Sequence, residues 1–218
     1  TIAIDKHKTL WVGSYGGGLQ CLQGNKFVTP SWLNILSSSF VMMLQYDGQR
    51  DLLFVGTNGQ GVFVVDIAKQ NITNLFSTMS FNGWIYSLCY DNNGTLWIGT
   101  ARGIFAYNID AKKGEEIKFP KSEILMPQCL TVMNESLLIG TNKGLISYNI
   151  KKGESFDILS NENVKSIEVA EKDIWLTTSK SVIRIDKQSM KSYEYSSFEG
   201  FHIGEFHRNA HYLTDSHD

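Results

Sequence analysis

The sequence has few of the residues and segments that mark several classes of protein. Its 218 residues include only three prolines and three cysteines, namely Cys21, Cys89 and Cys129. Three cysteines are too few for a disulfide framework, and an odd number leaves at least one thiol unpaired. No stretch approaches the roughly 20 apolar residues that a membrane-spanning helix needs, and the first residues lack the basic and apolar regions of a signal peptide. We therefore expect neither a disulfide-rich fold nor a membrane span in this chain.

Charge is also sparse, and its signs are balanced. Lys and Arg number 20 and Asp and Glu number 22, which gives a formal net charge of −2. Proteins that bind nucleic acid or an anionic membrane through electrostatics carry an excess of basic residues, so we predict no nucleic-acid binding by this region. In contrast, the chain has 19 glycines and 12% aromatic residues. This composition favours a globular β protein with tight turns.

A five-residue motif recurs along the whole chain. Four copies have an apolar or aromatic core that ends in Gly-Ser or Gly-Thr, and the fifth is degenerate: Leu10–Ser14, Leu53–Thr57, Leu96–Thr100, Leu137–Thr141 and Ile174–Thr178. The second residues lie at positions 11, 54, 97, 138 and 175, so the spacings are 43, 43, 41 and 37. An acidic or Asn-rich turn precedes each copy, and a glycine turn follows four of them. Ser181 replaces that glycine in the fifth copy, where we expect a strained or differently built turn.

Each repeat contains four short apolar runs separated by turns, which is typical of a propeller blade. We predict an all-β fold, a β-propeller of four-stranded antiparallel blades at residues 1–38, 39–83, 84–125, 126–161 and 162–200. Residues 201–218 are predicted to form the first strand of a further blade. That extra strand would have no place in a closed five-bladed ring, so we expect a slice of a six- or seven-bladed ring. Where the second residue of the motif is Trp or Phe, its ring is predicted to fill space between neighbouring blades.

The segment from Asp91 to Ile104 resembles the two-component regulator propeller repeat, since it reads Asp-x-x-Gly-x-Leu-Trp-Ile-Gly-Thr-x-x-Gly-Ile. The other copies are similar to it, so the resemblance covers essentially the whole chain. It implies the periplasmic sensor region of a Bacteroidetes hybrid two-component system that responds to oligosaccharides from polysaccharide breakdown. It also implies a neighbouring propeller and an immunoglobulin-like domain of the same protein as partners, and allows a homodimer.

No catalytic motif is recognisable in the sequence. Nucleophile-elbow and phosphate-loop patterns are missing, and no pair of acidic residues is tied to one cleft as a glycosidase needs. We therefore expect no enzyme activity, no cofactor and no metal site in this chain. A non-catalytic propeller that serves as a protein-interaction scaffold is the alternative to a ligand sensor.

Five residues are candidates for ligand binding. In a propeller, the turns between second and third strands share one end of the blades with the blade-to-blade connections, and loops there carry function. Arg102, Lys143 and Lys180 occupy the same repeat position in that turn, where cations would suit a uronate or a sulfated sugar. Trp32 and Trp84 lie in blade-to-blade segments and are the predicted carbohydrate platforms. The alternatives are that these cations are simply solvated and that the tryptophans pack on the next blade or on a neighbouring domain.

Overall fold

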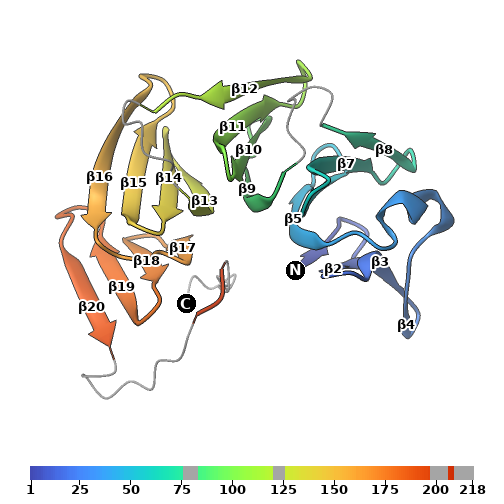
Figure 1. Ribbon diagram of the computed structural model, residues 1–218, viewed down its shortest axis with the longest axis horizontal. Coiled ribbons are helices and arrows are strands. Elements are labelled where there is room, and N and C mark those ends of the chain that lie inside the picture. Colours follow the sequence, from blue (N-terminus) through green and yellow to red (C-terminus); the bar gives the residue numbers. More distant parts are fainter. Residues whose placement is uncertain (76–82, 120–125, 197–205, 209–218) are drawn as a thin grey trace. The chain divides into compact units, whose positions relative to one another are not determined.

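The computed structural model describes residues 1–75, 83–119, 126–196 and 206–208. The named strands form five four-stranded antiparallel sheets, each made of four strands that are consecutive in the chain (Figure 1). The predicted all-β architecture of four-stranded blades is therefore confirmed. The chain divides into two compact units, Thr1–Ile117 with three blades and Lys118–Asp218 with two. We call them unit 1 and unit 2.

Unit 1 contains the first twelve strands. Blade 1 has β1 (Ile2–Ile4), β2 (Leu10–Ser14), β3 (Gly18–Gln23) and β4 (Lys26–Val28). Blade 2 has β5 (Val41–Asp47), β6 (Leu52–Thr57), β7 (Val62–Asp66) and β8 (Asn71–Asn74). Blade 3 has β9 (Ile85–Tyr90), β10 (Thr95–Thr100), β11 (Gly103–Asn108) and β12 (Lys113–Ile117). A 3-10 helix, η1 (Ser31–Leu36), connects blades 1 and 2 and buries Leu33 and Leu36; the sequence pattern did not predict it.

Unit 2 contains the remaining eight strands. Blade 4 has β13 (Pro127–Met133), β14 (Ser136–Thr141), β15 (Gly144–Asn149) and β16 (Glu154–Ser160). Blade 5 has β17 (Ser166–Val169), β18 (Asp173–Thr177), β19 (Ser181–Asp186) and β20 (Ser192–Ser196). The extra strand predicted for residues 201–218 lies outside the described residues, apart from 206–208, which are not in a strand.

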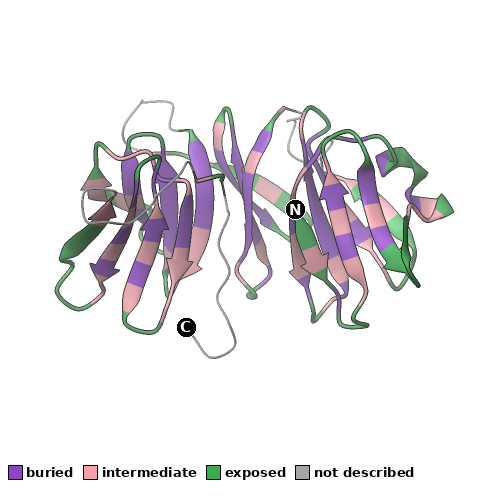
Figure 2. Cartoon of the chain, turned by 90° about the horizontal axis from the view of Figure 1, so that it is seen from below, coloured by how far each residue is buried: buried purple, intermediate pink, exposed green. Residues whose placement is uncertain are grey.

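The second residue of the motif packs against the following blade within each unit. Trp11 belongs to a buried cluster with residues of β5 and β6, and Phe54 to one with residues of β9 and β10. Leu138 is buried with residues of β17 and β18. Burying a large apolar side chain between two sheets contributes about 1.5–3 kcal/mol. The prediction that the aromatic ring at this position fills space between blades is confirmed for Trp11 and Phe54. Figure 2 shows buried residues running along the strands while exposed residues gather at the turns.

The glycine of the motif lets neighbouring blades approach closely. A Cβ atom added to Gly13 would lie 2.3 Å from Val41 Cγ1, and one added to Gly56 would lie 2.9 Å from Ile85 Cγ2. In unit 2 a Cβ atom on Gly140 would lie 2.8 Å from Cγ1 of Val164, which leads into blade 5. Real Cβ atoms are not found at such separations, because protein interiors are close-packed. The second strand thus carries glycine where its neighbours leave no room for a side chain.

The threonine of the motif closes the turn to the third strand. The Thr57 hydroxyl donates to the Gly61 carbonyl at 2.7 Å, and the Thr141 hydroxyl donates to the Gly144 carbonyl at 3.0 Å. The turn glycine has a positive φ, 78° at Gly61 and 149° at Gly144, which glycine adopts without steric cost. Ser181, at the fifth turn, is not among the described residues with positive φ; its hydroxyl instead lies 3.0 Å from that of Thr178. This turn is therefore built differently, as predicted.

Polar side chains join blades 2 and 3 at the end of the strands that carries the Asp-rich turns, which we call the Asp-turn end. The fully buried carboxylate of Asp47 accepts a hydrogen bond from Arg50 Nη1 at 3.0 Å. Arg50 Nη1 also donates to the Tyr90 hydroxyl at 2.9 Å, and the same guanidinium binds both oxygens of Asp110 at 3.1 and 2.8 Å. Burial alone would raise the pKa of Asp47, but hydrogen bonds with Tyr90 and Arg50 hold this pKa below its ordinary value.

A matching contact joins blades 1 and 2. The Tyr46 hydroxyl donates to Asp51 at 2.7 Å and accepts the backbone N–H of Lys6, in blade 1, at 3.0 Å. Burial, followed by the hydrogen bond to Asp51, raises the pKa of Tyr46 to about 12. Burial and the hydrogen bond to Asp47 raise the pKa of Tyr90 in the same way to about 12. Tyr46 and Tyr90 occupy one repeat position, since each pairs with the first leucine of its motif.

Candidate functional site: an aromatic row on unit 1

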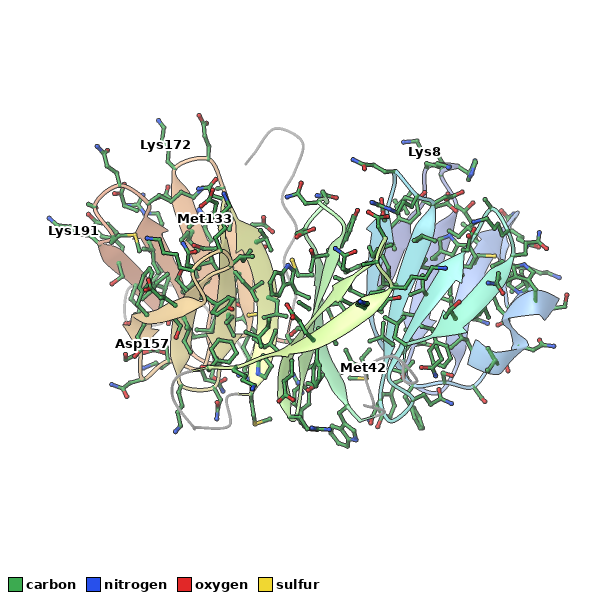
Figure 3. All side chains as sticks on the ribbon, turned by 90° about the horizontal axis from the view of Figure 1, so that it is seen from above. Lys8, Met42, Met133, Asp157, Lys172 and Lys191 are labelled. Carbon is green, nitrogen blue, oxygen red and sulfur yellow. The ribbon has the colours of Figure 1, made fainter. Side chains whose placement is uncertain are left out.

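The opposite end of the strands carries the motif's Gly-Thr pairs and the blade-to-blade connections, and we call it the Gly-Thr end. Lys8 at the Asp-turn end and Met42 at the Gly-Thr end mark the two ends of unit 1 in Figure 3. At this end each blade starts its first strand and finishes its second strand. The residue that follows the second strand of one blade therefore lies beside the residue that precedes the first strand of the next blade. This geometry brings side chains from distant parts of the sequence into one row.

Four aromatic residues form that row in unit 1. Tyr15 is 69% exposed and Phe40 43% exposed, and their ring centroids are 4.4 Å apart with an interplanar angle of 38°. Trp84 is 56% exposed, and its ring meets that of Tyr86 edge-on at 6.4 Å. We call Tyr15, Phe40, Trp84 and Tyr86 the aromatic row. Large aromatic rings are usually buried, so this degree of exposure is a surface feature that points to recognition.

Backbone contacts fix the spacing of the row. Isolated antiparallel bridges pair Tyr15 with Phe40 and Asn58 with Trp84. The N–H of Asn58 donates to the Phe40 carbonyl at 2.9 Å, so Asn58 stands between the two halves of the row. The Phe40 ring also lies over Gly16, whose Cβ position is 3.4 Å from a ring carbon. Because the backbone that carries these rings is hydrogen-bonded to neighbouring strands, little conformational entropy of the backbone would be lost when the rings contact a ligand.

Such a row can stack against the flat apolar faces of a ligand and exclude water from them. Asn58 and the exposed turn after it supply amide and backbone groups for hydrogen bonds beside the rings. Binding sites commonly combine an aromatic surface with a few placed polar groups. A chain of sugar rings has both apolar faces and hydroxyl edges, so it is one ligand that this surface suits.

The sequence pattern identified Trp84 but missed Tyr15 and Phe40. Phe40 precedes Val41, and Trp84 precedes Ile85; Val41 and Ile85 are the residues that meet the motif glycines Gly13 and Gly56. An alignment of the first strands on these contacts would therefore have placed Phe40 and Trp84 at one position. Tyr15 directly follows the motif, where the other blades have Asn58, Ala101, Asn142 and Ser179, so the repeat alone does not mark it.

The remaining predicted residues lie elsewhere. Trp32 is on η1 and packs, partly buried, against the core of blades 1 and 2, which agrees with the packing alternative. Arg102 Nη2 lies 3.9 Å from Glu116 Oε2, and both side chains are exposed. In unit 2, Lys180 Nζ lies 3.4 Å from Glu162 Oε1. Arg102 and Lys180 thus each have a nearby carboxylate that offsets their charge, and their role in binding stays a prediction.

Lys143 borders a small cavity of unit 2. The cavity has a volume of about 230 Å³ and is lined by Phe119, Phe156, Asp157 and Asn161, among others. Phe156 is 58% exposed, and Asp157 is labelled on β16 in Figure 3. The cavity has an aromatic wall beside a cation and a carboxylate, so it is a second candidate site for a polar ligand, on unit 2.

Comparison with known proteins agrees with the repeat and the fold. Residues 79–102 match the family model of the two component regulator propeller. This confirms the predicted resemblance. The match includes the third motif and ends at Arg102, one of the predicted ligand residues. No curated protein sequence is a significant match.

Solved structures with the same fold are larger than this chain. The extracellular domain assigned to the hybrid two component system BT4673 from B. thetaiotaomicron is 18% identical, with a TM-score of 0.79; the match covers 99% of this chain and 30% of that one. The corresponding domain of BT3049 from B. thetaiotaomicron is 20% identical, with a TM-score of 0.75, over 94% and 29% of the two chains. PorZ, a surface component of the type-IX secretion system of Porphyromonas gingivalis, is 14% identical, with a TM-score of 0.62, over 90% and 27%.

These likenesses show that the chain has a propeller fold and spans about a third of the length of the similar structures. Within the described residues, no helix is long and apolar enough to cross a bilayer.

Proposed function

We propose that this chain is part of the extracytoplasmic, periplasmic sensor propeller of a hybrid two-component system, and that it binds an oligosaccharide along the aromatic row of unit 1. The propeller repeat and the fold support the first part of the proposal. The observation that carries the second part is the exposure of Tyr15, Phe40 and Trp84 on one row. The chain itself is proposed to be non-catalytic.

Binding would proceed by stacking and not by charge. The row takes Tyr15 from blade 1, Phe40 from blade 2, and Trp84 and Tyr86 from blade 3, so a ligand several sugar units long would contact all three blades. Such a ligand favours whichever arrangement of the blades aligns the rings, and it can shift an equilibrium only by its difference in affinity between arrangements. The row therefore offers a physical route from ligand binding to a change in the attached output domains.

The test is titration of the protein with neutral, uronate-bearing and sulfated oligosaccharides, followed by tryptophan fluorescence and by the thermal midpoint. We expect one neutral oligosaccharide to raise the midpoint in a concentration-dependent way, because a ligand that binds only the folded state stabilises it. Trp84→Ala and Tyr15→Ala should each weaken binding roughly tenfold or more, since a stacked ring contributes on the order of 1–3 kcal/mol in comparable aromatic platforms.

Phe27→Ala is the matched control. Phe27 lies on β4 outside the row and is 47% exposed, about as much as Phe40. Its substitution should leave the affinity unchanged. Equal losses in Phe27→Ala and Trp84→Ala would contradict the assignment of the site, and no response to any sugar would contradict oligosaccharide binding by this chain.

A second candidate function, a protein-interaction scaffold, is favoured by one separate observation. Blade 1 has an exposed apolar surface on the side away from blade 2, where Ile2 is 67% and Ile4 59% exposed. Leu22 and Phe27 pair across strands on the same blade and are 36% and 47% exposed. Exposed apolar patches of this kind mark protein interfaces. Retained assembly with the rest of the protein in a variant that has lost sugar binding would separate this function from sensing.

A further inference from the structure

A groove runs between blades 2 and 3 of unit 1 at the Asp-turn end, opposite the aromatic row. Its volume is about 600 Å³. The floor is apolar and includes Leu52 and Val64 of blade 2 and Tyr107 of blade 3. The rim is polar and includes Asn71 and Thr73 of β8 on one side and Lys112, in the turn before β12, on the other. The groove therefore combines an apolar floor with hydrogen-bonding groups along its rim.

The end of the groove is held by the network that joins the two blades. Arg50, from blade 2, binds both carboxylate oxygens of Asp110, from blade 3, at 3.1 and 2.8 Å. Two parallel bonds of this kind fix direction as well as distance. The two walls of the groove are consequently kept at a set separation, which favours a preformed site.

The charges on the rim are balanced except for one. Arg50 is engaged by Asp47 and Asp110, and Lys69 Nζ lies 2.7 Å from Asp66 Oδ2. Lys112 forms no ion pair with any residue that the structure describes. The side chains of Asn71 and Thr73, which also line the groove, have no hydrogen-bond partner among the described residues. One ammonium group, one amide and one hydroxyl thus remain available above the apolar floor.

We propose that this groove binds a small amphipathic monoanion, an apolar skeleton that carries a single carboxylate. The skeleton covers Leu52, Val64 and Tyr107, where burial of apolar surface stabilises the complex. The carboxylate pairs with Lys112 in a charge-assisted hydrogen bond, and Asn71 and Thr73 bind its remaining oxygen lone pairs. A second negative charge on the ligand would face the carboxylates of Asp66 and Asp110, so dianions are disfavoured.

The test is calorimetric titration of the protein with hexanoate and phenylacetate, beside the neutral hexanamide and phenylacetamide and the dianion adipate. We expect the two monocarboxylates to bind and the amides and adipate to bind at least tenfold more weakly. Lys112→Gln should weaken binding of the monocarboxylates about tenfold, because it replaces a hydrogen bond from a charged ammonium group with a weaker one from a neutral amide. Lys112 has a φ of 52°; glutamine meets the same backbone penalty as lysine, so the folded turn is retained.

Lys113→Gln is the matched control, because Lys113 is the next residue, is exposed, and is not part of the groove lining. Its substitution should leave binding unchanged. Thr73→Trp places a bulky ring in the groove and should abolish binding of both monocarboxylates while far-ultraviolet circular dichroism stays that of the unaltered protein. Trp84→Ala should leave this binding intact, which separates the groove from the aromatic row.

Three results would overturn the proposal. One is the absence of any heat of binding for both monocarboxylates. Another is equal affinity for the carboxylates and their amides, which would remove the role of Lys112. The third is an equal loss in Lys112→Gln and Lys113→Gln, which would show that only the overall charge of the surface matters.

Discussion

Units 1 and 2 are built from the same blade but join their blades differently. Both have an apolar seam, in which the second motif residue meets the following sheet. In unit 1 the Asp-turn end adds Tyr46-Asp47 and Tyr90-Asp91, whereas the matching positions in unit 2 hold Val132-Met133 and Val169-Ala170. The turns of unit 2 are tied within their own blades instead, for example by Lys187 Nζ on the Ala170 carbonyl.

The difference shows which part of the blade contact is general. The apolar seam is common to both units, whereas the polar contacts between blades differ in place: in unit 2, Gln128 of blade 4 binds Asn163 and Lys165 of blade 5 at the Gly-Thr end. The polar network of unit 1 carries a desolvation cost that its hydrogen bonds must offset, and in return it fixes the relative direction of two turns. Such networks depend on every member, so they should respond to single substitutions and to pH in ways that the apolar seam does not.

The largest effect is expected from the buried carboxylate of that network. Asp47→Asn removes the charge that Arg50 and Tyr90 face, and should destabilise blades 2 and 3 by about 3 kcal/mol. Hydrogen exchange of the amides in β6 and β10, measured by mass spectrometry, reports this loss by region. Asp91→Asn is the control at the same repeat position, because among the described residues Asp91 accepts hydrogen bonds from backbone N–H groups of its own turn alone; its cost should be about 1 kcal/mol. Equal costs would mean that the network adds nothing beyond turn geometry.

Overpacking at the motif glycines should rank next, and its cost should follow the distance from the new methyl group to its nearest neighbour. In Gly140→Ala the new methyl group would lie 2.3 Å from Cys129 Sγ and 2.8 Å from Val164, whereas in Gly56→Ala the nearest atom is 2.9 Å away. We expect roughly 3 kcal/mol for the first and roughly 1 kcal/mol for the second, within the range known for overpacked cores. Denaturant unfolding monitored by hydrogen exchange in β14 and β6 measures both. Gly48→Ala, with its nearest side-chain atom at 3.7 Å, should be close to neutral.

The smallest effect is a difference in alkaline stability between the units. The pKa values of Tyr46 and Tyr90 are raised to about 12 in the folded protein, above the value of about 10 for a free tyrosine. Folding therefore favours the neutral phenols, and the stability that they contribute is present below pH 10 and is lost as pH rises from about 10 to about 12. Amide protection in β5 and β9 should fall over this range more steeply than in β13 and β17.

Tyr90→Phe tests the cause of that difference. Phenylalanine does not ionise, so the variant should start with lower protection in β9 at neutral pH but lose less of it between pH 10 and 12. If its alkaline loss equals that of the unaltered protein, the tyrosines are not responsible and another group must titrate.

The sequence allowed the blade to be predicted because each motif residue makes the contact that its chemistry suggests. Phe54 fills the seam, Gly56 admits the next blade, and Thr57 closes the turn. These contacts recur at a fixed spacing, so a repeat in the sequence reveals them. The unusual turn at Ser181 was foreseen for the same reason, since it departs from the repeat.

The candidate site was predicted only in part, because it depends on contacts between blades that no repeat position records. Trp84 was found as an aromatic in a connecting segment, but its partners depend on the bridge from Asn58 and on Phe40 in the preceding blade. The groove likewise needs Lys112 and Thr73, from different blades, to face each other. The 3-10 helix η1 escaped prediction because six residues are too few to show a helical period.

The close contact of Gly140 with Cys129 has one further consequence. Cys129 is 1% exposed, and burial raises the pKa of its thiol to about 12, so a thiol reagent should not react with it while blades 4 and 5 stay packed. Modification of Cys129 would then require blades 4 and 5 to separate, so the modification rate would report how often they separate. Unit 2 thus contains a native thiol through which the opening of its seam can be followed, with no cysteine introduced by mutation.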